Sequence, residues 1–181
     1  MTRIEILKRE NMTEDQGRIY DEVEAAGGPL GGPYYAYIRN PELMRKVQEL
    51  RNCLQAGPLS GRERQIVHLS VARHWGAKYP WAAQVRASLE AGLDQEIIDT
   101  INANGVPKLD DPREKAAFDV ARELLADRRL SDATYAAAEE RLGLEDLVAV
   151  VASVGQFSMT CCTTNAFDIA PPGDAPTPLI E

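Results

Sequence analysis

Residues 60–84 restrict the fold more than any other stretch, because they predict two apolar helices joined by a very short turn. Ser60 and Glu63 have the spacing of a capping box, in which each side chain accepts a hydrogen bond from the other residue's backbone N–H, so a helix should begin there. Residues 66–72 are almost all apolar, and most of this helix should therefore be buried. Gly76 should end it. The tight turn that follows brings positions on both helices within reach of one space.

The remainder of the chain also predicts helices, separated by glycine, proline and capping residues. No stretch has a convincing strand pattern, so the sequence predicts an all-α fold in a single domain covering residues 1–181. The second helix of the central pair should begin near Pro80 and end at Gly92. Residues 1–12 should form an extended arm, and the proline-rich residues 170–181 an extended tail or a segment bound to a neighbour. The other helices are expected over residues 13–25, 41–57, 94–102, 111–126, 131–143 and 144–162.

Composition and charge argue against several classes of protein. A chain of 181 residues with 44% hydrophobic and 27% charged residues is ordinary for a soluble globular domain. The net charge of −8 argues against binding to nucleic acid or to an anionic membrane surface. No apolar run is expected to span a bilayer, and the first residues lack the long apolar core of a signal peptide. Three cysteines make no disulfide framework, so a reducing cytoplasm is the expected location.

Several short sequence motifs resemble those of the carboxymuconolactone decarboxylase and AhpD-like family. The resemblance is carried first by Ala72-Arg73-His74-Trp75 and Tyr79-x-Trp81, and then by Gly31-Gly32-Pro33-Tyr34, Asn40-Pro41-Glu42-Leu43, Ala91-Gly92-Leu93, Asp111-Pro112-Arg113-Glu114 and Asn165-Ala166-Phe167. It covers nearly the whole chain. It implies an AhpD-like helical fold that assembles as a homotrimer or as a homohexamer of two trimers. In the decarboxylase branch, it implies a lyase that uses no cofactor and acts on a lactone bearing a carboxylate.

The residues that carry proton transfer in the family are replaced in this chain. Gln65 stands where the resemblance places a glutamate, and Gln84 where it places a histidine. A glutamine amide does not titrate in the useful range, so it can orient a substrate but cannot act as a general base. The peroxidase branch has Cys-x-x-Cys before that histidine, and here those two positions are Ala77 and Pro80. A thiol peroxidase is therefore disfavoured.

His68 is the candidate for the missing base, since it lies one helical turn after Gln65 on the same face, where the family usually has an apolar residue. The alternative is a neutral core histidine held by one hydrogen bond. If His68 acts as the base, activity should follow a single ionisation somewhat below neutral, because burial lowers the pKa of a histidine. Gln65 and Gln84 would then stabilise an oxyanion or enolate through their amide N–H groups. These three residues are the predicted catalytic set.

Five further residues are candidates for binding the substrate. Arg73 could hold a carboxylate through its guanidinium fork, or could pair with one of the many acidic residues. His74 lies near the helix end, where a histidine also satisfies free carbonyl groups. Tyr79 and Trp81 belong to the matched motif, although Trp81 could equally be a core or interface anchor. The fifth candidate is Tyr34.

The glycine- and proline-rich residues 27–33 cannot hold a helix and are followed by several tyrosines. No Gly-Lys-Ser/Thr follows them, so a phosphate-binding loop is not supported. They form either a plain mobile connection or, as the resemblance implies, a lid over the site. Tyr34, Tyr35 and Tyr37 could hydrogen-bond a polar ligand or pack at a subunit interface.

The cysteines favour packing over chemistry. Cys53 is expected to be a small core residue. Cys161 and Cys162 are adjacent, so they point in different directions on a helix and should not form a redox pair. Two histidines and no clustered Cys/His spacing give no credible metal site, and no metal or other cofactor is expected.

Two functions from different classes remain. The first is a cofactor-independent small-molecule enzyme that resembles carboxymuconolactone decarboxylase. It would be a lyase, hydratase or isomerase acting on a lactone or keto acid, with altered proton-transfer residues. The second is a non-catalytic relative that binds a ligand or supports an assembly, which the loss of both the glutamate and the histidine favours.

Overall fold

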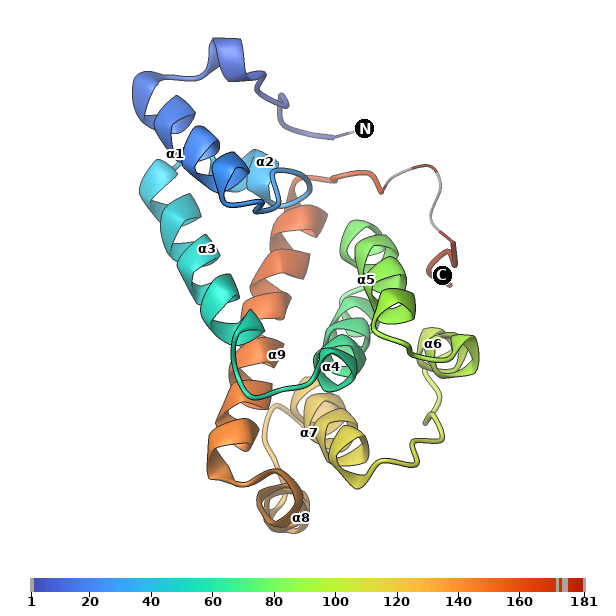
Figure 1. Ribbon diagram of the computed structural model, residues 1–181. Helices are drawn as coiled ribbons and strands as arrows, with labels where there is room; N and C mark the ends of the chain where they lie inside the picture. The colour runs from blue at the N-terminus through green and yellow to red at the C-terminus, as the bar shows by residue number, and fades with distance from the viewer. Residues whose placement is uncertain (1, 172, 174–175, 181) are drawn as a thin grey trace.

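The computed structural model describes residues 2–171, 173 and 176–180, and within them every regular element is helical, which confirms the all-α prediction (Figure 1). A short 3₁₀ turn, Arg9–Asn11, lies in the N-terminal arm that was expected to be extended. The α-helices are α1 (Glu14–Ala25), α2 (Tyr34–Tyr37), α3 (Pro41–Gln55), α4 (Gly61–His74), α5 (Lys78–Glu90), α6 (Gln95–Asn102), α7 (Pro112–Asp127), α8 (Asp132–Leu142) and α9 (Leu144–Ala166).

The predicted capping box at the start of α4 is present. The Ser60 hydroxyl accepts from the Glu63 N–H at 3.1 Å, and the Glu63 carboxylate accepts from the Ser60 N–H at 2.7 Å. These two bonds fix where α4 begins and therefore where every later residue of that helix points. At the other end, Gly76 has a φ of +56° and makes the tight turn into α5.

Helix α4 is the centre of the larger core. It packs against α5, α7 and α9, and Figure 1 shows it enclosed between them. Side chains on all its faces are shielded from solvent, and those of Ile66, Val67, Leu69 and Val71 are fully buried. Because α4 is surrounded by other helices, its apolar side chains are removed from water. Their burial is the main contribution to the stability of this region.

Helix α9 corrects one expectation from the sequence. Its 23 residues, Leu144–Ala166, are long and apolar enough to cross a membrane by length and composition alone, contrary to what the sequence suggested. Its contacts give it another role, because α9 packs against α3, α4, α5, α7 and α8 (Figure 1). Phe157 and Cys161 lie on its buried side. In this fold α9 is a core helix that joins the two halves of the molecule.

The N-terminal helices α1, α2 and α3 form a second, smaller core around buried residues such as Met44 and Val47. This layer lies against α9, where the Tyr37 hydroxyl is 3.0 Å from the Thr163 hydroxyl. Figure 1 shows α3 and the α4–α5 pair on opposite sides of α9. The space between α3 and α4–α5 is where the candidate site lies.

The C-terminal tail runs along its own chain, beside α5 and α6. The Trp81 indole N–H donates to the Thr177 carbonyl at 2.8 Å, and the Asn102 amide donates to the Pro178 carbonyl at 2.9 Å. Asn102 also accepts from the Ile180 N–H at 3.0 Å. The tail was expected to be extended or bound to a neighbour, and residues 176–180 are held by contacts within the same chain. Residues 172, 174–175 and 181 of that predicted tail lie outside the described part of the chain.

Candidate functional site

A cavity of about 270 Å³ lies between α3, α4, α5 and α9, roofed by the loop that leads into α2. Its lining combines apolar walls with polar side chains that point inward from four helices. The apolar lining residues are Pro29, Pro33, Leu54, Pro80, Ala87 and Phe157. The polar ones are Tyr34, Arg51, Gln55, Arg64, Gln65, His68, Tyr79, Gln84, Gln156 and Thr160. A concave site with apolar walls and convergent polar groups is a candidate for binding a small molecule, here one with several polar groups of its own.

The structure brings the three predicted catalytic residues together. Gln65 and His68 line the cavity from α4, where a spacing of three residues places them on one face, and Gln84 lines it from α5. Gln65 is only 9% exposed, and its Oε1 atom has no hydrogen-bond partner within the described residues. A buried carbonyl oxygen without a partner is costly, so a ligand that donates a hydrogen bond there would recover that free energy.

His68 is held by two contacts that fix the plane and tautomer of its ring. The Nδ1 atom lies 3.3 Å from Gln84 Oε1, so Nδ1 carries the proton and donates it to this oxygen. The imidazole also stacks on the ring of Phe157, with centroids 4.1 Å apart and planes 12° from parallel. With Nδ1 protonated, the lone pair of His68 lies on Nε2, which no described residue contacts through a hydrogen bond. His68 therefore lines the cavity with one unprotonated ring nitrogen that has no partner among the described residues.

The pKa of His68 is lowered to about 4, mainly by burial; the hydrogen bond to Gln84 opposes this shift, and the nearby Arg64 and Arg51 guanidinium groups add smaller decreases. His68 is therefore uncharged at neutral pH. The direction agrees with the sequence prediction, and the shift is larger than expected mainly because of the burial of the ring.

The glycine-rich loop is packed against the site. Pro29 and Pro33 line the cavity, and Gly32 has a φ of +64°. A Cβ atom at Gly32 would lie 2.3 Å from the ring of Tyr79, so only glycine lets this loop approach the tyrosine. The loop therefore covers the cavity, as the lid interpretation requires.

Tyr34 and Tyr79 line the cavity as predicted. Burial raises the pKa of Tyr34 to about 12 and also raises the pKa of Tyr79. Both phenols thus stay protonated and can donate a hydrogen bond.

Three predicted substrate-binding residues lie elsewhere, and their expected place in the site is corrected. Arg73 and His74 line a separate hollow beside α7, because they follow His68 by five and six residues and so emerge from other sides of α4. The Arg73 Nη1 atom donates to the Ile180 carbonyl at 2.6 Å. Trp81 is fully buried and anchors the C-terminal tail, so it is a core residue.

Arg51 and Arg64 are the cavity residues that the sequence reasoning missed. Arg64 precedes His68 by four residues, so helical spacing already places both on one side of α4. Arg51 comes from α3, and no local pattern connects it to α4. Only the packing of the N-terminal layer against α9 brings it to the cavity.

The cysteines take no part in lining this cavity. Cys161 is buried, and burial raises the pKa of its thiol, whereas Cys53 and Cys162 are exposed. The exposure of Cys53 contradicts its expected core position. None of the three is among the described residues that line the cavity. Within residues 2–171, 173 and 176–180, no group of three His, Cys, Asp or Glu side chains is placed to hold a metal ion.

The model of the carboxymuconolactone decarboxylase family matches residues 41–123, which include α3, α4, α5 and most of the cavity lining. This part of the chain, slightly less than half of it, is therefore similar to the carboxymuconolactone decarboxylase family. No curated protein matches the chain.

Solved structures share the AhpD-like fold at low sequence identity. An uncharacterized peroxidase-related protein from Ralstonia eutropha JMP134, described as an alkylhydroperoxidase AhpD core, is 18% identical with a TM-score of 0.74, over 96% of this chain and 93% of that one. A peroxidase-related protein from Silicibacter sp. TM1040 is 17% identical with a TM-score of 0.77, over the same shares of the two chains, 96% and 93%. ATU0492 from Agrobacterium tumefaciens, a protein of unknown function described as a putative antioxidant defence protein AhpD, is 17% identical with a TM-score of 0.70, over 77% and 97%. At these identities the similarity shows the fold alone.

Proposed function

We propose that the chain is a cofactor-independent enzyme of the decarboxylase-like branch, a lyase, hydratase or isomerase that acts on a small lactone or keto acid. The observation that supports this best is His68, a neutral imidazole that lines a polar cavity together with Gln65 and Gln84 and whose Nε2 atom has no hydrogen-bond partner among the described residues. A fixed neutral base beside amide donors suits proton transfer at a carbon next to a carbonyl group.

The proton transfer can be written from these groups. Nε2 of His68 takes a proton from the carbon next to the substrate carbonyl, and the electron pair of the C–H bond moves to the carbonyl oxygen. The resulting enolate oxygen accepts hydrogen bonds from the amide groups of Gln65 and Gln84 or from the phenol of Tyr79. The Nδ1–H of His68 already donates to Gln84 Oε1, which stabilises the imidazolium while it exists. The same proton then returns to the substrate at a different atom, which completes an isomerisation or prepares bond cleavage.

The proposal is tested by exchange of substrate C–H for deuterium in D₂O, followed by NMR on a panel of small keto acids and lactones. His68→Asn keeps size and some hydrogen bonding but removes the base, so the exchange rate should fall by about 10²–10⁴. His74→Asn is the matched control, since His74 lines a different hollow, and its rate should stay near the wild-type value. Normal exchange by the folded His68→Asn variant would overturn the proposal.

A ligand-binding relative without catalysis is the second candidate. It is favoured by the amides at positions 65 and 84 and by the low pKa of His68, about 4, which makes the imidazole a weak base. Saturable binding of a panel member with no exchange above the uncatalysed rate would support it over the enzyme.

We also propose a homo-oligomer, a trimer or a hexamer of two trimers. Support comes from the outer face of α9, where Leu144 and Val148 are each 58% exposed and Val151 is 41% exposed. An apolar helix face of this kind is commonly covered by another subunit. Light scattering at micromolar concentration should give a multiple of the protomer mass, and the mass of one protomer would refute the assembly.

A further inference from the structure

We propose that Arg51 and Arg64 form a carboxylate subsite in the cavity, and that the natural ligand is a small carboxylate that also presents a hydroxyl or enol O–H to Gln65. The inference rests on the proposed function in one respect, which is that this cavity is the substrate site. It adds the two residues that hold the carboxylate of the substrate and the donor group that Gln65 requires.

The first observation is that these two arginines lack carboxylate partners. Arg51 donates to the side-chain oxygen of Asn52 at 3.2 Å, and Arg64 donates to the backbone carbonyls of Gln55 and Leu59 at 3.3 Å each. Within residues 2–171, 173 and 176–180, neither arginine contacts an Asp or Glu side chain. Their other N–H groups therefore remain available for a ligand.

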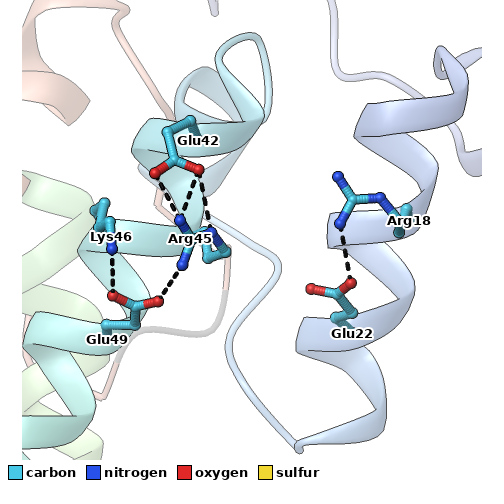
Figure 2. Close-up of polar contacts among 6 residues, drawn as sticks. All are labelled: Arg18, Glu22, Glu42, Arg45, Lys46 and Glu49. Carbon is cyan, nitrogen blue, oxygen red and sulfur yellow. Dashed lines mark hydrogen bonds and ion pairs between the residues drawn. The ribbon is translucent and has the colours of Figure 1, made fainter.

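This is unusual for the chain, which has 28 acidic residues against 20 basic ones. Other arginines contact carboxylates readily, as Arg18 does with Glu22 and Arg45 with Glu42 and Glu49 on the outer surface (Figure 2). In a chain with so many acidic residues, the lack of a carboxylate partner for both Arg51 and Arg64 must be explained by their surroundings.

The cause lies in the composition of the cavity. Of the described residues that line it, none is an Asp or a Glu. Arg51 and Arg64 both approach His68 closely enough to lower its pKa, and Arg51 likewise lowers the pKa of Arg64 after burial has done so. The cavity therefore concentrates positive charge, and a bound anion relieves the repulsion between the two cations. Guanidinium groups bind carboxylates in a planar, two-bonded geometry, which makes a carboxylate the fitting occupant.

Gln65 supplies the second requirement. Its side chain lines the cavity, and its buried Oε1 atom lacks a partner among the described residues, so an O–H or N–H donor would satisfy it. The enol of a keto acid carries both a carboxylate and an O–H group. A volume of about 270 Å³ lies just below the usual range for ligand pockets, so the ligand should be small.

The arrangement also links binding of a carboxylate to the pKa of His68. A carboxylate between the arginines cancels the two positive charges that disfavour protonation of His68. Ligand binding should therefore raise the pKa of His68, and a neutral analogue should leave it almost unchanged. A merely structural role for the arginines would not produce this difference.

The experiment uses the His74→Asn variant, in which His68 is the one histidine left of the two in the chain, so that its imidazole C–H signals are unambiguous by NMR. Three probes of similar size separate the requirements: 4-hydroxybutanoate has the carboxylate and the hydroxyl, butanoate has only the carboxylate, and 1,4-butanediol has only hydroxyls. Each is titrated at low ionic strength, and the pKa of His68 is measured with and without each probe.

We expect 4-hydroxybutanoate to bind at least about tenfold more tightly than 1,4-butanediol and to raise the pKa of His68, with butanoate between them in affinity. Arg51→Gln and Arg64→Gln should each weaken both carboxylates by about tenfold or more, while the surface variant Arg45→Gln should not. Gln65→Leu should remove the preference for 4-hydroxybutanoate over butanoate and keep the preference for the carboxylate.

Equal affinity for the diol and the hydroxy acid, the absence of a saturable shift with 4-hydroxybutanoate, or unchanged binding in both arginine variants would overturn the subsite. The test of the subsite is independent of the test of the proposed function. Charge-selective binding without any proton exchange would remove the enzyme proposal and leave the subsite standing, and exchange without charge selectivity would do the reverse.

Discussion

Replacing Arg113 by methionine should destabilise the protein strongly, because this arginine joins the start of the site helix to two other helices. Its Nε atom donates to Glu63 at 2.8 Å, and its Nη2 atom donates to Asp146 at 2.6 Å. Arg113 is on α7, Glu63 on α4 and Asp146 on α9. These carboxylates raise the pKa of the arginine, Asp146 most and Glu63 next. Removing the guanidinium leaves the Glu63 carboxylate, only 4% exposed, without its cation.

The expected loss follows from burial of the charges. Removing one partner of a buried ion pair costs about 3–5 kcal/mol, because the other charge is left unpaired. The Arg113 side chain is 35% exposed, so water will partly solvate the vacated space and the lower end applies. We therefore expect a loss of about 3 kcal/mol in the free energy of unfolding. For a chain of this size, that corresponds to a fall in Tm of about 6–12 °C.

Urea unfolding followed by circular dichroism at pH 7 and one fixed protein concentration measures this loss. The matched control is Arg45→Met, because Arg45 contacts two carboxylates on the open surface of α3 (Figure 2), where such pairs contribute about 1 kcal/mol or less. Glu63→Gln in the Arg113→Met background removes the stranded charge but keeps the cap on Ser60, so it should recover more than half of the loss. If Arg113→Met is no less stable than Arg45→Met, the argument from burial is wrong.

Four further predictions concern His68, the cysteines and Trp81. Because burial and two cations hold the pKa of His68 near 4, its neutral form is complete above that value, so catalysis should fall only as pH drops through about 4, which a pH–rate profile measures. The same shift means that the unfolded state binds more protons between pH 4 and 6.5, so urea unfolding should show stability rising with pH across that window. Replacing all three cysteines by serine should leave any turnover largely intact, and a clear loss with the fold preserved would contradict the assigned site. Trp81→Phe removes the N–H donor to Thr177 and should cost about 1 kcal/mol, with faster amide exchange in residues 176–180.

The sequence predicted the helices well because residues close in sequence determine where each helix begins and ends. Capping boxes and glycines act over a few residues, and α4 begins and ends within two residues of the predicted positions. The tetrapeptide helix α2 was missed because it follows a loop rich in glycine and proline and has no capping side chain. The expectation that no stretch could span a bilayer was wrong for α9. It considered only uninterrupted apolar residues, whereas the helix as a whole extends to Ala166 and is long and apolar enough.

The site was only half predictable, and helix geometry explains which half. Successive residues turn by about 100°, so Gln65, His68 and Arg64 share one side of α4, whereas Arg73 and His74 fall on others. That rule was available from the sequence and would have removed Arg73 and His74 from the site. It could not say which side of α4 meets a cavity, because polar side chains lie on several sides of the helix. Arg51 required the tertiary packing of α3 against α9.

Gln65→Glu tests two roles separately: proton transfer at position 65 and binding of the substrate carboxylate by the arginines. The substitution restores the acid that the family resemblance places in α4. A carboxylate at this position would lie in a cavity with two guanidinium groups and no acidic lining residue among those described, so it should be stabilised in its charged form. In the His68→Asn background, Gln65→Glu should recover part of the lost proton exchange. The new carboxylate should also compete with an anionic substrate for Arg51 and Arg64, so the recovered kcat should come with a raised KM. The His68→Asn variant with Gln65→Asn is the control for a change at that site without a new charge. Recovery in neither parameter would show that position 65 does not reach the reacting proton, and recovery of kcat with an unchanged KM would show that the arginines are not where the substrate anion binds.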